Sequence, residues 1–222
     1  MSRRGRTLFL MGKPEQLKEA EDILLEAWNL RSYASFENLD YLLNHLAGLY
    51  SRLENYEEAH NWLNLEQENL DKNTNLSDEQ KLKYQIYIDR ERAELLFMQK
   101  NYDESKKYCE TVIRNTEGKE TGLRNANYVK RILADIAVQE KQLERAEELL
   151  KLVYEEVKLN NDKRRIAYCE VSWAKLETAK GQLPKALEYI QKALNNFNYL
   201  GMSKDYAQAL ALYKEIKNKR NE

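Results

Sequence analysis

A short segment recurs five times along this chain of 222 residues. Each copy carries a small residue, here called the marker, with an aromatic residue or leucine three positions before it and an apolar residue four positions after it. Successive markers are 39, 46, 41 and 40 residues apart. The markers are Ala20, Ala59, Ser105, Ala146 and Ala186. A period of this length is typical of proteins that stack one supersecondary unit many times.

A second small residue precedes the marker by twelve positions in four of the five copies. These residues are Ala47, Ala93, Ala134 and Ala174, and the first copy has Leu8 instead. Turn residues lie between the two columns, such as Glu54-Asn55 and Gly181-Gln182. Two helices pack at the short end of the ~8–10 Å range only where their side chains are small. Each copy is therefore predicted to be a helix–turn–helix.

Glycine and proline are scarce in this chain, with seven and two residues. Sandwiches, barrels and doubly wound α/β folds need frequent tight turns, so this composition argues against them. The chain is predicted to be all-α, and Ser77 with Gln80 predicts a capping box at the start of the fifth helix. The expected helices cover residues 2–11, 15–31, 36–53, 56–71, 78–99, 102–115, 120–140, 143–159, 163–180, 183–198 and 203–219.

The segments Leu46-Ala-Gly-Leu-Tyr50 and Glu54-Asn-Tyr-Glu-Glu-Ala59 match the pattern of the tetratricopeptide repeat (TPR) family, which the chain resembles over nearly its whole length. The resemblance implies a right-handed α-solenoid of about five repeats with a C-terminal capping helix, all in one domain over residues 1–222. The repeats would cover about 1–34, 36–71, 78–115, 120–159 and 163–198, and the capping helix 203–219.

The chain departs from the TPR pattern in three ways. Its period exceeds the 34 residues usual in the family, the family's proline near the repeat end is absent, and Arg92 and Glu177 occupy columns that are usually apolar. Long-period arrays of this kind resemble the C-terminal sensor arrays of STAND-type signalling ATPases. Residues 162–168 and 196–202 resemble segments found there.

The first helix of each pair would line the concave groove of such a solenoid. At about 100° per residue, Leu43, Leu46 and Ala47 face the core in the second copy, which places Tyr41 and Asn44 on the groove side. The same register, carried along the chain, predicts nine partner-binding residues. They are Tyr41, Asn44, Tyr87, Arg90, Glu94, Tyr128, Arg131, Tyr168 and Lys175.

Tyrosine offers rigid contact area with a polar tip, and arginine pairs with carboxylates in a fork. A groove with four tyrosines and a central pair, Arg90 and Arg131, would therefore suit an extended or helical peptide that carries an acidic group. A second interpretation stays open. The tyrosines would fill the junctions between repeats, while Glu94 and Asp135 neutralise the two arginines.

The remaining features argue against other functions. The 36 basic and 37 acidic residues leave no basic excess for a dedicated nucleic-acid binder. His45 and His60 are expected to be isolated surface histidines, so no metal or cofactor is predicted. No phosphate-binding or nucleophile motif suggests an enzyme. Cys109 and Cys169 fit buried thiols of a cytoplasmic protein, and the apolar runs are too short to cross a membrane.

The sequence thus predicts a non-enzymatic protein–protein interaction scaffold, a sensor or adaptor in signalling or regulation that holds a protein or peptide in its groove. The alternative is a bacterial regulator that responds to a peptide pheromone. A helical-repeat RNA-binding protein is the third interpretation, disfavoured by the charge balance. Self-association through the ends of the array also stays open.

Overall fold

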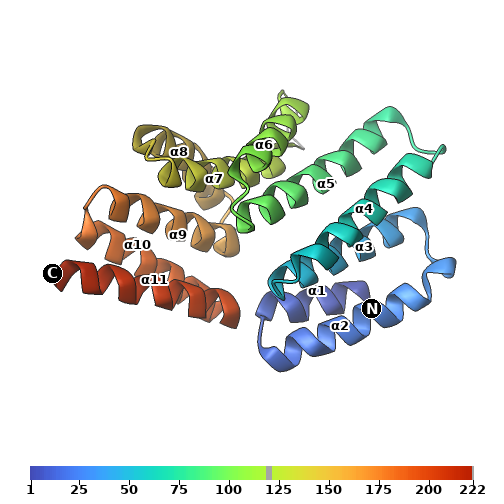
Figure 1. Ribbon diagram of the computed structural model, residues 1–222, viewed down its shortest axis with the longest axis horizontal. Coiled ribbons are helices and arrows are strands. Elements are labelled where there is room, and N and C mark those ends of the chain that lie inside the picture. Colours follow the sequence, from blue (N-terminus) through green and yellow to red (C-terminus); the bar gives the residue numbers. More distant parts are fainter. Residues whose placement is uncertain (119–121, 222) are drawn as a thin grey trace. The chain divides into compact units, whose positions relative to one another are not determined.

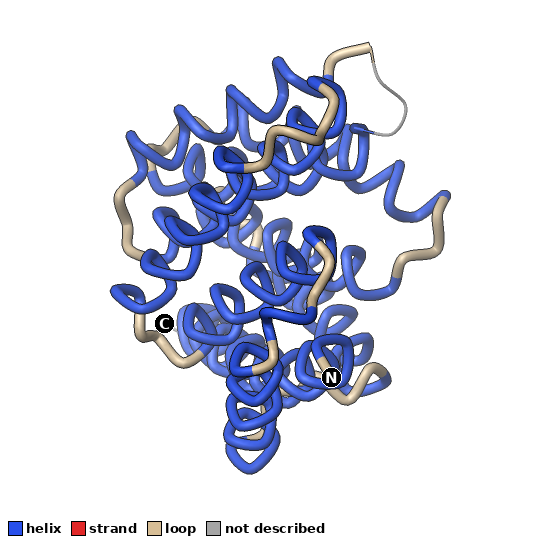
Figure 2. Tube along the Cα trace, turned by 90° about the vertical axis from the view of Figure 1, so that its right-hand side faces the viewer, coloured by secondary structure: helices blue, strands red, loops and turns tan. Residues whose placement is uncertain are grey.

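The computed structural model describes residues 1–118 and 122–221. This described part contains eleven α-helices, one 3-10 turn and no strand, so the chain is all-α, as predicted (Figure 1; Figure 2). The helices are α1 (Ser2–Met11), α2 (Pro14–Asn29), α3 (Phe36–Arg52), α4 (Tyr56–Lys72), α5 (Asp78–Met98), α6 (Tyr102–Thr116), α7 (Leu123–Gln139), α8 (Leu143–Leu159), α9 (Lys163–Ala179), α10 (Leu183–Tyr199) and α11 (Ser203–Asn221), with the 3-10 turn η1 (Arg31–Tyr33) after α2.

The predicted helix ends agree with these bounds to within two residues, apart from the start of α7. That start was expected at residue 120, which lies outside the described residues. The capping box before α5 is confirmed. The Ser77 hydroxyl accepts from the backbone N–H of Gln80 at 3.3 Å, and the Gln80 side chain accepts from the backbone N–H of Ser77 at 2.9 Å.

Six helix connections are three-residue turns of one geometry. The middle residue always has a left-handed backbone, with φ between 48° and 73°. These residues are Glu54, Lys100, Lys141, Asn161, Gly181 and Gly201. The next N–H donates to the carbonyl five residues earlier, as from Asn55 to Tyr50 at 3.0 Å. This is the Schellman pattern, which ends a helix abruptly and lets the chain turn back on itself.

The two small-residue columns meet inside the helix pairs, as predicted. All five markers are fully buried, and the residues twelve positions earlier in the last four copies are at most 1 % exposed. In the third copy the Ser105 hydroxyl donates to the backbone carbonyl of Ala93 at 2.7 Å. The hydrogen bond joins the two columns directly, so the polar marker is satisfied in the core.

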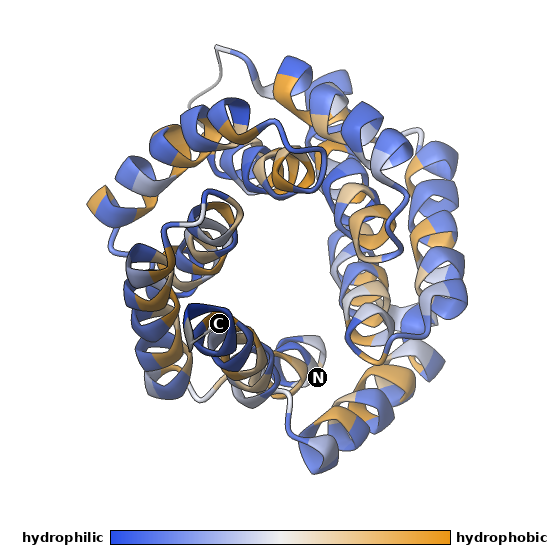
Figure 3. Ribbon diagram, turned by 60° about the vertical axis from the view of Figure 1, so that its left-hand side comes forward, coloured by the Kyte–Doolittle hydropathy of each residue, from blue (hydrophilic) through white to orange (hydrophobic). Residues whose placement is uncertain are grey.

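The chain forms two compact units, Met1–Ala126 (unit 1) and Asn127–Glu222 (unit 2), and the boundary falls within α7. Hydrophobic and hydrophilic residues alternate along most helices, as expected of helices that bury one side (Figure 3). Unit 1 has a core that includes Leu24, Leu43, Leu46, Ala59 and Leu63. Unit 2 has cores that include Trp173, Leu176, Ile190, Phe197 and Ile216. How the units join into one array or domain stays a prediction.

The surface position expected for His45 is wrong. Helix α1 lies against α3 and leaves His45 only 9 % exposed, with its Nδ1 atom 2.6 Å from the Ser2 hydroxyl and its ring edge-on to Phe9. Burial, together with the charge of Arg6, lowers the pKa of His45 to about 4, so the ring is neutral at pH 7. The two cysteines are buried free thiols, as expected.

Candidate partner-binding faces

Five of the nine predicted binding residues lie in unit 1, where α3 carries Tyr41 and Asn44 and α5 carries Tyr87, Arg90 and Glu94. Tyr41 is 39 % exposed, the largest exposure among the four tyrosines of this column, and its ring stacks on His45. Burial raises the pKa of the Tyr41 hydroxyl, with further contributions from the charges of Glu37 and Tyr87. Tyr41 and Tyr87 thus lie on α3 and α5 of the same unit.

The charge of Arg90 is already compensated within unit 1. Its Nε atom donates to Glu91 at 3.1 Å, and its Nη1 atom donates to the Asn125 side chain at 2.9 Å. The side chain is only 18 % exposed, and the guanidinium lies 5.3 Å from the ring centroid of Tyr87. Sequence reasoning named Glu94 as the neutralising residue, whereas the structure adds Glu91, the next residue along the chain.

The other four predicted residues lie in unit 2, with Tyr128 and Arg131 on α7 and Tyr168 and Lys175 on α9. The Arg131 guanidinium lies 5.5 Å from the ring centroid of Tyr128 and 5.6 Å from that of Tyr168, which are cation–π distances. The Tyr168 hydroxyl donates to Asp205 of α11 at 2.8 Å. Both the cation and the aromatic rings are thus fixed in place by their neighbours.

Asp135 binds the two cations of this cluster through one oxygen. Its Oδ2 atom lies 2.9 Å from Lys175 Nζ and 3.5 Å from Arg131 Nη1. Asp135 is only 2 % exposed. Burial by itself raises the pKa of this carboxyl, but the charges of Lys175 and Arg131 outweigh burial, so the pKa lies below its ordinary value and Asp135 is ionised at pH 7.

Of the nine residues Tyr41 is exposed, and the other eight are partly exposed. The side chain of Lys175 is 33 % exposed, against 12 % for Arg131. The ion pair of Asp135 with Arg131 is the one that the second interpretation of the sequence described. Arg90 and Arg131 lie in different units, so their joint action on one acidic group stays a prediction.

Sequence reasoning missed two buried carboxyl groups beneath the unit 1 face. Glu66 of α4 is fully buried, and Asp40 of α3 is 2 % exposed. Glu66 Oε1 accepts from the Asn44 amide at a long 3.4 Å. The other oxygen of Glu66 and the Oδ1 atom of Asp40 have no hydrogen-bond partner within the described residues. Buried polar atoms are nearly always paired. Asp135 also has one such oxygen, but its other oxygen pairs with two cations.

Burial is the main reason why the pKa values of Asp40 and Glu66 are raised. It raises the pKa of Asp40 to about 7, helped by the charge of Glu37 and opposed by Lys83. It also raises the pKa of Glu66 well above its ordinary value, with the charges of Asp40 and Glu91 adding to the effect. A signal for Glu66 exists in the sequence. The column seven positions after the markers contains Ala27, Glu66, Val112, Val153 and Ala193, so one charged residue stands among four apolar ones.

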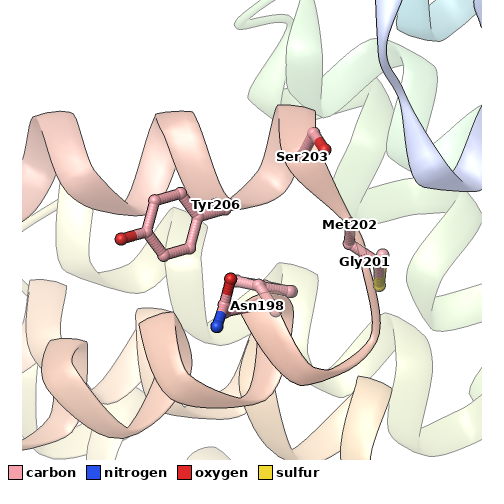
Figure 4. A pocket seen from close by; sticks show the side chains of 6 residues that line it. Asn198, Gly201, Met202, Ser203 and Tyr206 are labelled. Atoms are coloured by element: carbon pink, nitrogen blue, oxygen red, sulfur yellow. The ribbon is translucent and has the colours of Figure 1, made fainter.

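A small hollow of about 120 Å³ lies at the turn between α10 and α11 (Figure 4). Its lining consists of Phe197, Asn198, Gly201, Met202, Ser203 and Tyr206. The side chains of Asn198 and Tyr206 project into the same space from the two helices. Its volume is well below the ~300 Å³ at which ligand pockets usually begin.

The described residues contain no group of three or more His, Cys, Asp and Glu side chains arranged to hold a metal ion. Within the same part of the chain, no helix is both long enough and apolar enough to cross a membrane.

No protein-family model matches the chain. No curated protein matches it either. Among solved structures, the fold is similar to that of BtubC (BKLC) from P. vanneervenii, with a TM-score of 0.58. The two chains are 17 % identical, and the similarity covers 93 % of this chain and 90 % of BtubC. At that identity the likeness concerns the fold alone.

Proposed function

We propose that the chain is a non-enzymatic scaffold of TPR-like repeats that binds a partner protein or peptide. In this proposal the helix pairs stack as a right-handed solenoid of about five repeats, α11 is the capping helix, and the first helices present the binding groove. The protein would act as a sensor or adaptor within a signalling or regulatory process.

The observation that carries the proposal is the column of tyrosines on successive first helices. Each has another side chain beside its ring or hydroxyl, such as His45 for Tyr41 and Asp205 for Tyr168. A tyrosine that is already ordered loses little further side-chain entropy when a partner covers its exposed edge. Such residues can therefore contribute to binding at a small cost in side-chain entropy.

The ion pairs of Arg90 and Arg131 change which chemical groups are expected in the ligand. Because Glu91 and Asp135 already hold Arg90 and Arg131, neither guanidinium is offered to a partner as an isolated charge. Asp135 also pairs with Lys175, at 2.9 Å, but the Lys175 side chain is 33 % exposed, so it is the cation of the three that a partner's carboxylate would reach most easily. The ligand would combine apolar or aromatic side chains for the tyrosine edges with one acidic group for Lys175.

The test is affinity capture from the source cell lysate with mass spectrometry, followed by titration with the purified partner. Tyr41→Ala and Lys175→Ala are the binding variants. Tyr33→Ala and Lys192→Ala are matched controls, because Tyr33 is 89 % exposed and Lys192 is 48 % exposed, both outside the predicted groove. Circular dichroism first establishes that all four variants are folded.

We expect a partner whose affinity falls about tenfold in a binding variant and stays constant in the controls. Equal affinity for all four variants would move the binding site away from this face. Recovery of a short peptide would favour the pheromone-responsive regulator, and recovery of RNA with strong salt dependence would favour the RNA-binding protein.

A further inference from the structure

The two carboxyl groups beneath the unit 1 face have no dedicated counter-ion. An ionised carboxylate without a partner is very costly in a protein interior, so such a group normally holds a proton instead. Asp40 and Glu66 each have an oxygen that lacks any hydrogen-bond partner in the described part of the chain. The packing around this pair in unit 1 should therefore depend on its protonation.

The charged and titratable groups that face the pair come from α3 and α5. From α3, Glu37 lies near Asp40, and Asp40 in turn lies near Glu66. From α5, Lys83 and Tyr84 lie near Asp40, whereas Glu91 and Arg90 lie near Glu66. The two cations compensate weakly, because Lys83 is exposed to solvent and Arg90 is held by Glu91 and Asn125.

Ionisation of the pair would place two negative charges at buried positions, where the charges of Glu37 and Glu91 already disfavour them. Both carboxyls are buried, and α5 packs on α3 through the rings of Phe36 and Tyr84. It is also joined to α4 by the side-chain hydrogen bond of Gln67 with Gln85 at 2.8 Å. Hydration of the ionised carboxylates would therefore require these contacts to loosen.

That loosening would also move the binding face, since Tyr41 and Asn44 lie on α3 whereas Tyr87 and Arg90 lie on α5. The protonation of the pair and the geometry of the face are thus linked.

We propose that the contact of α5 with α3 and α4 is a pH-sensitive hinge, which is closed while Asp40 and Glu66 hold protons and loosens as they ionise. The consequence for partner binding rests on the proposed function, whereas the loosening itself does not. The direction follows from linkage. A carboxyl whose pKa is raised in the folded state favours that state at low pH and loses this contribution as the pH rises toward the raised pKa.

Hydrogen–deuterium exchange with mass spectrometry, at about pH 6 and about pH 8, tests the hinge in the full chain. After correction for intrinsic exchange, we expect the protection of α3 to α5 to fall about tenfold or more between the two conditions, because a carboxyl with a pKa near 7 alone gives about that factor. Helix α2 of the same unit serves as the reference and should keep its protection.

The matched variants are Asp40→Asn and Glu66→Gln, which keep the shape but cannot ionise. Each should reduce the pH response of α3 to α5, and the double variant should abolish it. Glu170→Gln, in unit 2, is the control and should leave the response unchanged. Equal protection at both pH values, or an undiminished response in the double variant, would overturn the hinge. Neither result would bear on the proposed function, which the capture experiment tests separately.

Discussion

Units 1 and 2 both bury carboxyl groups, but they stabilise them in different ways. In unit 2, Asp135 is ionised and shares two cations, Lys175 and Arg131. In unit 1, Asp40 and Glu66 are buried without such cations, and burial raises the pKa of both. A buried carboxyl is tolerable either as one member of an ion pair or as a neutral acid. The stability contributed by the ion pair is lost as the pH falls, whereas the stability contributed by the neutral acid is lost as the pH rises.

Glu170 of unit 2 represents a third arrangement. It is 3 % exposed, and burial raises its pKa, yet both of its oxygens accept hydrogen bonds. Tyr154 donates to one at 3.3 Å and Asn196 to the other at 3.0 Å. The difference between Glu170 and Glu66 is therefore the supply of donors rather than the depth of burial.

The largest loss of stability that we expect from one substitution comes from removing the carboxylate of unit 2. Asp135→Ala leaves Arg131 and Lys175 as neighbouring like charges, so we expect it to destabilise unit 2 by about 3 kcal/mol. Urea denaturation measures the change, followed by the fluorescence of Trp173 in a Trp28→Phe, Trp62→Phe background. Lys151→Ala is the control, since its ion pair with Glu147 lies at the surface and should contribute less than ~1 kcal/mol. A loss as small as the control's would mean that the Asp135 pair contributes no more than a surface one.

The second effect should have the opposite sign. Glu66→Val removes a fully buried carboxyl that lacks one partner, so we expect unit 1 to gain about 2 kcal/mol at pH 7. Val112→Glu is the reciprocal change in the same column and should destabilise unit 1, because Val112 is fully buried. Denaturation measures both, followed by the fluorescence of Trp28 and Trp62 in a Trp173→Phe background. A destabilising Glu66→Val would show that the carboxyl is well solvated internally.

The pH dependence of stability should distinguish Asp40 from Asp135. The pKa of Asp40 is about 7 in the folded state, so its contribution is present below about pH 4 and is lost as the pH rises toward 7, at about 1.4 kcal/mol per pH unit. The pKa of Asp135 is lowered, so its contribution is present above about pH 4 and is lost as the pH falls further.

The measurement is the free energy of unfolding as a function of pH, for the native chain and for Asp40→Asn. The difference between the two should change steadily between about pH 4 and about pH 7 and then level off. A constant difference over that interval would show that Asp40 ionises normally in the folded protein.

The smallest expected effect concerns the turns. Lys141 has a left-handed backbone with φ of 62°, where Gly181 and Gly201 stand in the equivalent turns of unit 2. Lys141→Gly should stabilise unit 2 by about 1 kcal/mol, and Gly181→Ala should destabilise it by a similar amount. Thermal melting by circular dichroism measures both. Changes of the same sign would show that side-chain contacts, rather than backbone conformation, dominate these turns.

The helices could be predicted from the sequence because their signals are local. The markers, the small residues twelve positions earlier and the turn residues lie within one helix pair, and the Schellman turns depend on only six consecutive residues. The binding residues could be placed on their helices by the same periodicity. Their partners could not, since Arg90 and Asn125 are 35 residues apart and Asp135 and Lys175 are 40 residues apart.

The sequence by itself therefore determined the class of fold, the helix bounds and the helix faces on which the tyrosines lie. Only the tertiary structure decided which charges are compensated, that His45 is buried by α1, and that Glu66 lies in the core beneath Asn44. The physical reason is that helical periodicity fixes the direction of a side chain about its own axis. The dielectric environment and the partners of that side chain depend on how neighbouring helices pack against it.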